Sequence, residues 1–201
     1  MPNPLLRPNA AAFLPSGRYG REDGEAGIGM RIVFGRALVQ LIARGHRDDA
    51  LKDAVRSKYG IALPEKPAMA RSPELSFLWS GHRSWMAMAG EGDTPDLESR
   101  LRDDLGSLVS GSDQSDAWLL LELSGAKARD ALAKLTPIDL HPRVFRPGDT
   151  AMTLFGHIAG QITQIDSVPT FELMVFRGFA EFFLNDVKTA GAEFGIEVSG
   201  A

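Results

Sequence analysis

The sequence predicts an α+β fold made of two ferredoxin-like split β-α-β lobes that pack together. Residues 30–110 follow the order strand, helix, strand, strand, helix, strand, which is the order of that unit. The second half then begins the same order again with an apolar strand and an alanine-rich helix. The chain has 201 residues, 44% of them hydrophobic, so it is long enough to bury a core without disulfides or metals.

The chain divides into an N-terminal tail and a folded domain. We expect residues 1–26 to be a flexible tail, because prolines at positions 2, 4, 8 and 15 interrupt it and leave no signal-peptide core. Residues 27–201 form the α+β domain, with sub-lobes at about 27–111 and 112–201. No apolar run approaches the ~18 residues that a membrane span needs.

The first lobe opens with two strands and an amphipathic helix. Residues 30–34 and 37–42 are aliphatic and β-branched, which favours extended backbone. Aspartates suited to a helix start come next, so the helix should begin near Asp48. Apolar residues recur at helical spacing up to Gly60, which suits a C-terminal cap.

A hairpin completes the inner part of this lobe. Residues 64–73 contain three prolines and indicate a connection without regular structure. Residues 75–80 and 84–89 are apolar, and the three residues between them have the length of a hairpin loop. We therefore expect a pair of antiparallel strands.

The second helix of the first lobe is expected after Thr94, which suits an N-cap, and Pro95, which suits the first helical position. Leucines line one helix face until a glycine ends it: Leu97, Leu101, Leu105 and Gly106. Residues 107–110 should then form a strand.

The second lobe begins with a strand at 117–125 and a helix at 126–135, which Pro137 stops. Further on, the stretches 150–158 and 161–166 are expected to pair across a turn at Ala159 and Gly160. Residues 170–176 alternate as a strand. The last helix has the clearest stripe, which is typical of a core or subunit interface: Phe179, Phe182, Phe183, Val187, Ala190 and Phe194, with Gly195 after them.

Composition excludes several classes of partner. The formal net charge is −4, from 22 basic and 26 acidic residues spread along the chain, so no basic surface for nucleic acid or a membrane is expected. The absence of cysteine removes disulfides, thiolate metal sites and cysteine nucleophiles, and it fits a reducing compartment. We therefore predict a soluble, cytoplasmic protein that binds neither nucleic acid nor membranes.

Known catalytic and cofactor motifs are missing from the sequence. The Gly-x-Gly at 27–29 lacks the third glycine of a Rossmann fingerprint, and the histidines at 46, 82, 141 and 157 fit no metal-ligand spacing. Neither a Gly-x-Ser-x-Gly elbow nor a P-loop occurs, and the serines within 110–116 suit turns. The residues therefore predict no catalytic, cofactor-binding or metal site in this chain.

Several stretches resemble the gamma subunit of heterotetrameric sarcosine oxidase, over roughly residues 37–197. The most specific are SDQSD (112–116), SGAKARDALAK (124–134) and DLHPRVFRPGDT (139–150). In addition, LWSGHRSWMAM (78–88) resembles the family's pattern of a strand, a Gly-Pro turn and a tryptophan. His82 stands there where proline is usual, which affects only a turn.

More distantly, the same part of the chain resembles the folate-binding half of glycine cleavage T-protein, an aminomethyltransferase, and this implies the same fold. In those enzymes a hairpin carries two glycines and then an acidic residue that acts on the folate. Here AGQITQ (159–164) places Thr163 and Gln164 in that neighbourhood, and neither can serve as a carboxylate base. The resemblance therefore implies the scaffold without its chemistry.

The resemblance implies a non-catalytic gamma subunit of an oxidase that demethylates sarcosine to glycine. The methyl carbon would leave as formaldehyde or methylene-tetrahydrofolate, and oxygen would become hydrogen peroxide. The implied partners are the alpha, beta and delta subunits. FAD, FMN, NAD and tetrahydrofolate are implied for those partners, and no cofactor is expected on this chain.

Three alternatives stay open at this point. The chain could belong to a related N-methylglutamate dehydrogenase complex, which only the substrate pockets of its partners would separate from a sarcosine oxidase. It could be a free-standing folate-binding protein of the T-protein type, against which Thr163 and Gln164 count. The third alternative, an unrelated orphan domain, requires the long motif match to be accidental.

The stiff, locally basic segment at 139–150 is predicted to dock a neighbouring subunit. Its two prolines restrict the residues before them, so the segment has less backbone freedom to lose on binding. Arg143 offers a planar fork for a partner carboxylate, and Phe145 offers an aromatic anchor. Alternatively, the loop only caps its own domain, with Arg143 paired to Asp139 or Asp149. The interface residues we predict are His141, Pro142, Arg143, Phe145, Arg146, Pro147 and Gly148.

Overall fold

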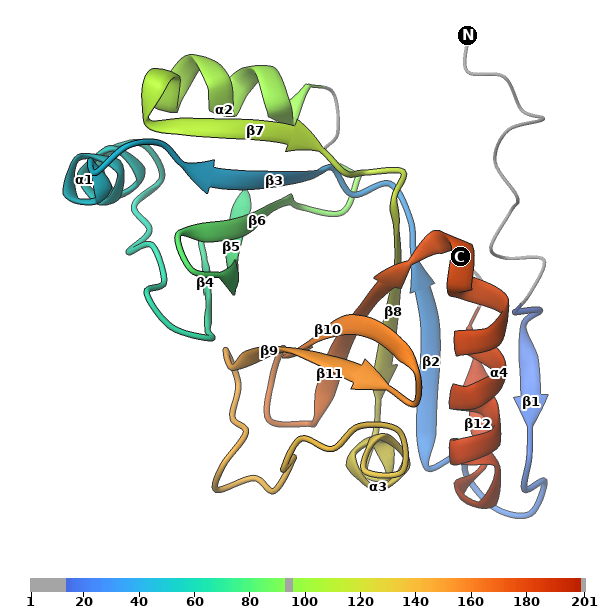
Figure 1. Cartoon of the computed structure of the whole chain (residues 1–201). Coiled ribbons are helices and arrows are strands. Elements are labelled where there is room, and N and C mark those ends of the chain that lie inside the picture. The colour runs from blue at the N-terminus through green and yellow to red at the C-terminus, as the bar shows by residue number, and fades with distance from the viewer. Residues whose placement is uncertain (1–13, 93–95, 200–201) are drawn as a thin grey trace, which may run out of the picture. The chain divides into compact units, whose positions relative to one another are not determined.

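The structure, a computed structural model, describes residues 14–92 and 96–199 and shows a mixed α+β fold with two β-sheets (Figure 1). The seven-stranded sheet has the order β1-β12-β2-β8-β11-β10-β9, and the five-stranded sheet has the order β4-β5-β6-β3-β7. The predicted fold class is therefore confirmed.

The bounds of the elements are as follows. The seven-stranded sheet comprises β1 (Gly17–Tyr19), β2 (Ile28–Val33), β8 (Trp118–Ser124), β9 (Thr150–Phe155), β10 (Ile158–Gln164), β11 (Thr170–Phe176) and β12 (Ile196–Val198), and its helices are α3 (Ala128–Leu132) and α4 (Ala180–Gly191). The five-stranded sheet comprises β3 (Leu38–Ala43), β4 (Met69–Arg71), β5 (Leu75–Gly81), β6 (Ser84–Ala89) and β7 (Val109–Asp113), and its helices are α1 (Asp48–Tyr59) and α2 (Leu97–Leu105). Three short 3-10 helices are η3 (Gly106–Leu108), η4 (Arg177–Phe179) and η5 (Ala192–Phe194).

The chain forms two compact units that are interleaved in sequence. Of the described residues, the first unit holds 14–33, 119–147 and 153–199, and the second holds the remainder. These units differ from the contiguous sub-lobes 27–111 and 112–201, because β2 joins the sheet of the later strands. Its register with β8 sets Met30 opposite Leu123, and both side chains are buried. A strand pairs where its apolar face finds a match, so sequence order alone does not assign it.

The expected tail at 1–26 is ordered in part. Strand β1 pairs with β12, with Arg18 opposite Glu197, so residues 17–19 belong to the seven-stranded sheet. The first thirteen positions of the tail lie outside the described residues.

The second unit closely matches the order of elements that the sequence predicts for the first lobe. Helix α1 begins at Asp48 and ends at Tyr59, and Gly60 caps it with a left-handed φ of 67° that suits glycine. The predicted cap at Thr94 and Pro95 lies outside the described residues, and the side chain of Asp96 accepts a hydrogen bond from the Ser99 N–H. The connection at 64–73 holds one short strand, β4, that the prolines did not indicate. Apolar side chains from α1, α2 and the sheet form one buried core.

A hydrogen bond ties α1 to α2 over that sheet. The Tyr59 hydroxyl donates to Asp104 Oδ2 at 2.7 Å, and Lys58 pairs with the same carboxylate. The Tyr59 hydrogen bond, followed by Lys58, lowers the pKa of Asp104, while burial and then the bond to Asp104 raise the pKa of Tyr59. Tyr59 therefore stays a protonated donor at neutral pH.

We expect Tyr59→Phe to lower the free energy of unfolding at pH 7 by about 1 kcal/mol, because it removes one hydrogen bond to a carboxylate. Since the folded pKa of Asp104 lies below its ordinary value of about 3.9, this stabilisation is present above that value and is lost as pH falls through the folded pKa. Urea unfolding at pH 7 and at about pH 3 checks this, and an equal difference at both pH values would contradict it.

The hairpin of the first unit departs from the prediction. Strands β9 and β10 turn at Gly156 and His157, and Gly156 has a φ of 59°. The turn expected at Ala159 and Gly160 is wrong, because both residues lie inside β10. A Cβ at Gly160 would stand 2.4 Å from the Met174 carbonyl oxygen, so this glycine permits close strand packing rather than a turn.

The helices of the first unit, which the sequence placed in the second lobe, are partly as predicted. Helix α3 spans only Ala128–Leu132, and the Leu135 carbonyl accepts from the Gly156 N–H at 2.7 Å instead of continuing the helix. In α4, Phe183 is fully buried and its ring packs at 5.2 Å from the ring of Phe155. The aromatic stripe is not one continuous core face, because Phe179 and Phe182 are exposed.

Candidate subunit interface

We call residues 139–147 the docking segment, after the role that the sequence predicts for them, and all of them belong to the first unit. Five of the predicted interface residues in it are exposed: His141, Pro142, Arg143, Arg146 and Pro147. Phe145 is only 6% exposed. Gly148 belongs to the second unit, where its carbonyl accepts from the Met69 N–H at 2.7 Å and its φ of 90° suits glycine.

Local hydrogen bonds give the docking segment a defined shape. Asp139 Oδ1 accepts from the His141 N–H at 2.9 Å, and the His141 carbonyl accepts from the Phe145 N–H at 2.9 Å. His141 Nδ1 in turn accepts from the Arg143 N–H at 3.2 Å. Backbone donors that a free loop would leave to water are therefore bonded within the segment.

Arg129, on the short helix α3, stabilises the docking segment through hydrogen bonds to its backbone. Its guanidinium donates to the carbonyl of Leu140, to the carbonyl of Phe145 at 3.4 Å, and to Gln164 Oε1 at 2.8 Å. The same guanidinium lies 5.0 Å from the centroid of the Phe171 ring. One side chain thus joins two points of the docking segment to strands β10 and β11.

Phe145 does not face solvent as the sequence suggested. Its ring stacks on Phe171 at a centroid distance of 6.5 Å. The segment is therefore anchored to its own unit by an aromatic contact. Val144, which is 58% exposed, adds an apolar side chain to its exposed prolines.

The docking segment presents an uncompensated positive charge. In the part of the chain that the structure describes, the guanidinium of Arg143 has no hydrogen bond or ion pair, so neither Asp139 nor Asp149 neutralises it. Arg146 donates to the Arg143 carbonyl at 3.0 Å. Burial lowers the pKa of Arg129, which meets carbonyl and amide oxygens and an aromatic ring rather than a carboxylate. An exposed charge of this kind is matched in complementary interfaces by a group of opposite sign.

The residues compared above with the T-protein hairpin are buried in β10. Gln164 accepts from Arg129 and donates through Nε2 to the Asp166 carbonyl at 2.7 Å, so its amide is used structurally. Thr163 lies opposite Glu172 of β11, and both are buried. Sequence reasoning missed Glu172, because an acidic residue within an apolar strand gives no spacing signal.

Two exposed phenylalanines lie at the start of α4. Phe179 is 49% exposed and Phe182 is 68% exposed. Phe179 is the last residue of η4 and Phe182 lies in the first turn of α4, so two exposed aromatic side chains of the kind that interfaces cover lie three residues apart.

We expect the isolated chain to self-associate at high concentration through these rings. The double variant Phe179→Ser/Phe182→Ser should stay monomeric at concentrations where the parent chain does not, with little change in unfolding free energy because both positions are exposed. Light scattering across a concentration series measures this. A parent chain that remains a stable monomer throughout would contradict the expectation.

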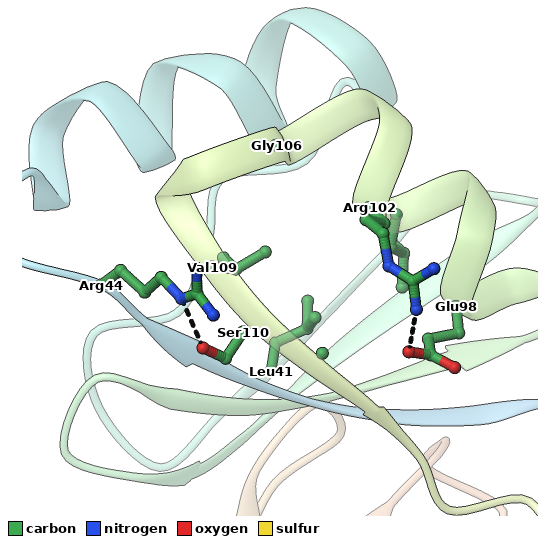
Figure 2. Close-up of a pocket in the computed structure, with 9 residues that line it drawn as sticks. Leu41, Arg44, Glu98, Arg102, Gly106, Val109 and Ser110 are labelled. Carbon is green, nitrogen blue, oxygen red and sulfur yellow. Dashed lines mark hydrogen bonds and ion pairs between the residues drawn. The ribbon is translucent and has the colours of Figure 1, made fainter.

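A small pocket lies in the second unit, between α2 and strands β3 and β7 (Figure 2). Arg44, Glu98 and Arg102 are the charged residues that line it. Over residues 14–92 and 96–199, no cluster of three or more possible metal ligands occurs, and no helix is long and apolar enough to cross a membrane.

A model of the family described as "Sarcosine oxidase, gamma subunit family" matches residues 44–193. The chain belongs to the sarcosine oxidase gamma subunit family. The match includes the docking segment, Arg129 and α4. No curated protein sequence matches the chain.

Solved structures agree with this gamma subunit family in fold. A chain of heterotetrameric sarcosine oxidase from Corynebacterium sp. U-96, in complex with pyrrole 2-carboxylate, is similar with a TM-score of 0.75 and 24% identity, over 88% of both chains. The glycine cleavage system aminomethyltransferase T from Bartonella henselae is similar with a TM-score of 0.63 and 14% identity, over 88% of this chain and 48% of that one. The chain thus spans about half of the aminomethyltransferase.

Proposed function

We propose that this chain is the non-catalytic gamma subunit of a heterotetrameric sarcosine oxidase. The family match over residues 44–193 is the observation that supports this most strongly. In the proposed complex, alpha, beta and delta subunits hold FAD, FMN, NAD and tetrahydrofolate. They carry out the oxidative demethylation of sarcosine to glycine, with formaldehyde or methylene-tetrahydrofolate and hydrogen peroxide as products.

The role of the chain in that complex is to dock its partners through the docking segment. Internal hydrogen bonds and Arg129 fix the backbone of the segment, so little freedom is lost on binding. Arg143 then offers its guanidinium to a partner carboxylate, and Val144 and Pro142 supply apolar contact beside it. Phe145 contributes by holding the segment, not by touching the partner.

One observation favours a second candidate function, folate binding of the T-protein type. Glu172 is a buried carboxylate that lies opposite Thr163, in the hairpin where T-proteins use an acidic residue. A folate-binding protein would bind tetrahydrofolate as an isolated chain, and Glu172→Gln would weaken that binding.

We expect the purified chain alone to be colourless, to lack oxidase activity and to bind no tetrahydrofolate. The physical reason is that Gln164, the side chain in place of a working acid, is already bonded to Arg129 and Asp166. An absorbance spectrum and a calorimetric titration with tetrahydrofolate measure this. Flavin retained through purification, or folate binding that Glu172→Gln abolishes, would overturn the non-catalytic role.

A further inference from the structure

The exposed rings at the start of α4 lie beside acidic side chains. Phe179 is 49% exposed and Phe182 is 68% exposed. Glu181 stands between them in the sequence, and Asp186 follows one helical turn after Phe182; both acidic residues are exposed. Among the described residues, neither of the two carboxylates has an ion pair. This surface therefore suits a segment that carries apolar side chains and a positive charge.

The chain that precedes β1 extends along α4 toward this surface (Figure 1). The Arg21 N–H donates to the Ala192 carbonyl at 2.7 Å, at the C-terminal end of α4. Two residues earlier, the ring of Tyr19 lies 5.5 Å from Lys188 Nζ, about one turn back along the helix. Strand β1 and helix α4 therefore run in the same direction, so the residues before β1 approach the N-terminal end of α4.

The rings are within reach of residues 1–13. Phe182 lies six residues before Lys188, which is about 9 Å along the helix axis at ~1.5 Å per residue. Thirteen residues of extended backbone span up to roughly 43 Å at ~3.3 Å per residue. Leu14, where the described chain starts, is only 5% exposed, so the segment leaves the first unit from a fixed point. It is long enough to cross α4 and cover both rings.

The sequence of residues 1–13, MPNPLLRPNAAAF, has the chemistry that this surface needs. Leu5 and Leu6 form an apolar pair, and Arg7 beside them carries the one charged side chain of the segment. That charge is opposite to the charge of the two carboxylates on α4. Prolines at positions 2, 4 and 8 reduce the backbone freedom that is lost on binding.

We propose that residues 1–13 bind over Phe179 and Phe182 of the same chain. The leucine pair packs on the rings, and Arg7 meets the carboxylates beside them. A short tether gives the segment an effective concentration in the millimolar range, so a second copy displaces it only when the protein is concentrated. The self-association expected above therefore begins only at high concentration. This inference does not involve the docking segment, so it stands whether or not the docking proposal does.

Disulfide trapping in the full chain tests this contact, because the chain has no cysteine of its own. The pair Asn3→Cys/Asn185→Cys leaves both rings and both leucines intact, and Asn185 is exposed three residues after Phe182. At micromolar protein we expect a disulfide within the monomer. The further change Phe179→Ser/Phe182→Ser should slow its formation by about tenfold or more, since the tether is unchanged and only the contact is lost. Val168→Ser, which removes another apolar side chain that is 72% exposed, is the matched control and should leave the rate unchanged.

Deletion of residues 1–13 gives a second measurement. Light scattering should detect association of the shortened chain at a concentration about tenfold lower than for the parent chain, because the rings are then uncovered. A trapping rate that loss of the rings does not change would overturn the proposal. Disulfide-linked dimers in place of the monomeric product would also overturn it, as would a shortened chain that associates no more readily than the parent.

Discussion

Arg143→Ala is expected to produce a folded subunit that no longer co-purifies with its partners. The guanidinium is exposed and, among the described residues, makes no bond within the chain, so its loss should change the unfolding free energy by no more than about 0.5 kcal/mol. In the complex, the substitution leaves a partner carboxylate without its mate, which costs ~2 to 5 kcal/mol. The dissociation constant should therefore rise roughly 30- to 5,000-fold.

Affinity capture from cells that also make the partner subunits measures this loss. Arg56→Ala removes another exposed arginine and should assemble normally. Arg143→Lys should restore assembly only in part, because an ammonium cannot make the bidentate contact. A complex of normal composition and salt resistance with Arg143→Ala, or a variant that simply unfolds, would refute the docking role.

Arg129→Met should loosen the docking segment and destabilise the first unit. The substitution retains the aliphatic stem but removes every donor to Leu140, Phe145 and Gln164, and it removes the cation from the face of Phe171. Two carbonyls of buried residues then lack this donor. We expect a loss of about 2 to 4 kcal/mol in unfolding free energy.

Trypsin reports the local effect of Arg129→Met, because it cleaves the exposed Arg143–Val144 bond only when the segment opens. Each 1.4 kcal/mol of lost local stability raises the open population by about tenfold, and the cleavage rate should rise with it. Assembly with the partners should weaken as well, although Arg143 itself is intact. Equal cleavage rates in the parent chain and the variant would show that Arg129 does not hold the segment.

Local signals in the sequence predicted local structure well. The helix from Asp48 to Gly60 and the hairpin strands of the second unit follow from spacing, aspartates and a cap glycine. Non-local pairing was not readable in the same way. Strand β2 joins the later strands because its register with β8 pairs buried apolar residues. Gly160 was predicted to be a turn residue, but its role is to allow the close approach of the Met174 backbone, which the sequence does not reveal.

The candidate interface could be located from sequence, but its internal support could not. Two prolines and the arginines mark the docking segment. The burial of Phe145, by contrast, depends on Phe171, which lies in the third strand after it along the chain. Arg129 lies in a predicted helix with no pattern that links it to a loop some ten residues later.

Co-expression with the flavin-containing subunits of a heterotetrameric sarcosine oxidase tests the central claim most directly. Native mass spectrometry of material captured through this chain, together with an assay of sarcosine-dependent hydrogen peroxide, measures composition and activity at once. We predict a four-subunit complex that contains at least one copy of this chain, absorbs light through its flavin and oxidises sarcosine. The chain captured alone should be inactive. A chain that stays alone during co-expression, or partner subunits that assemble and turn over sarcosine normally without it, would contradict the account.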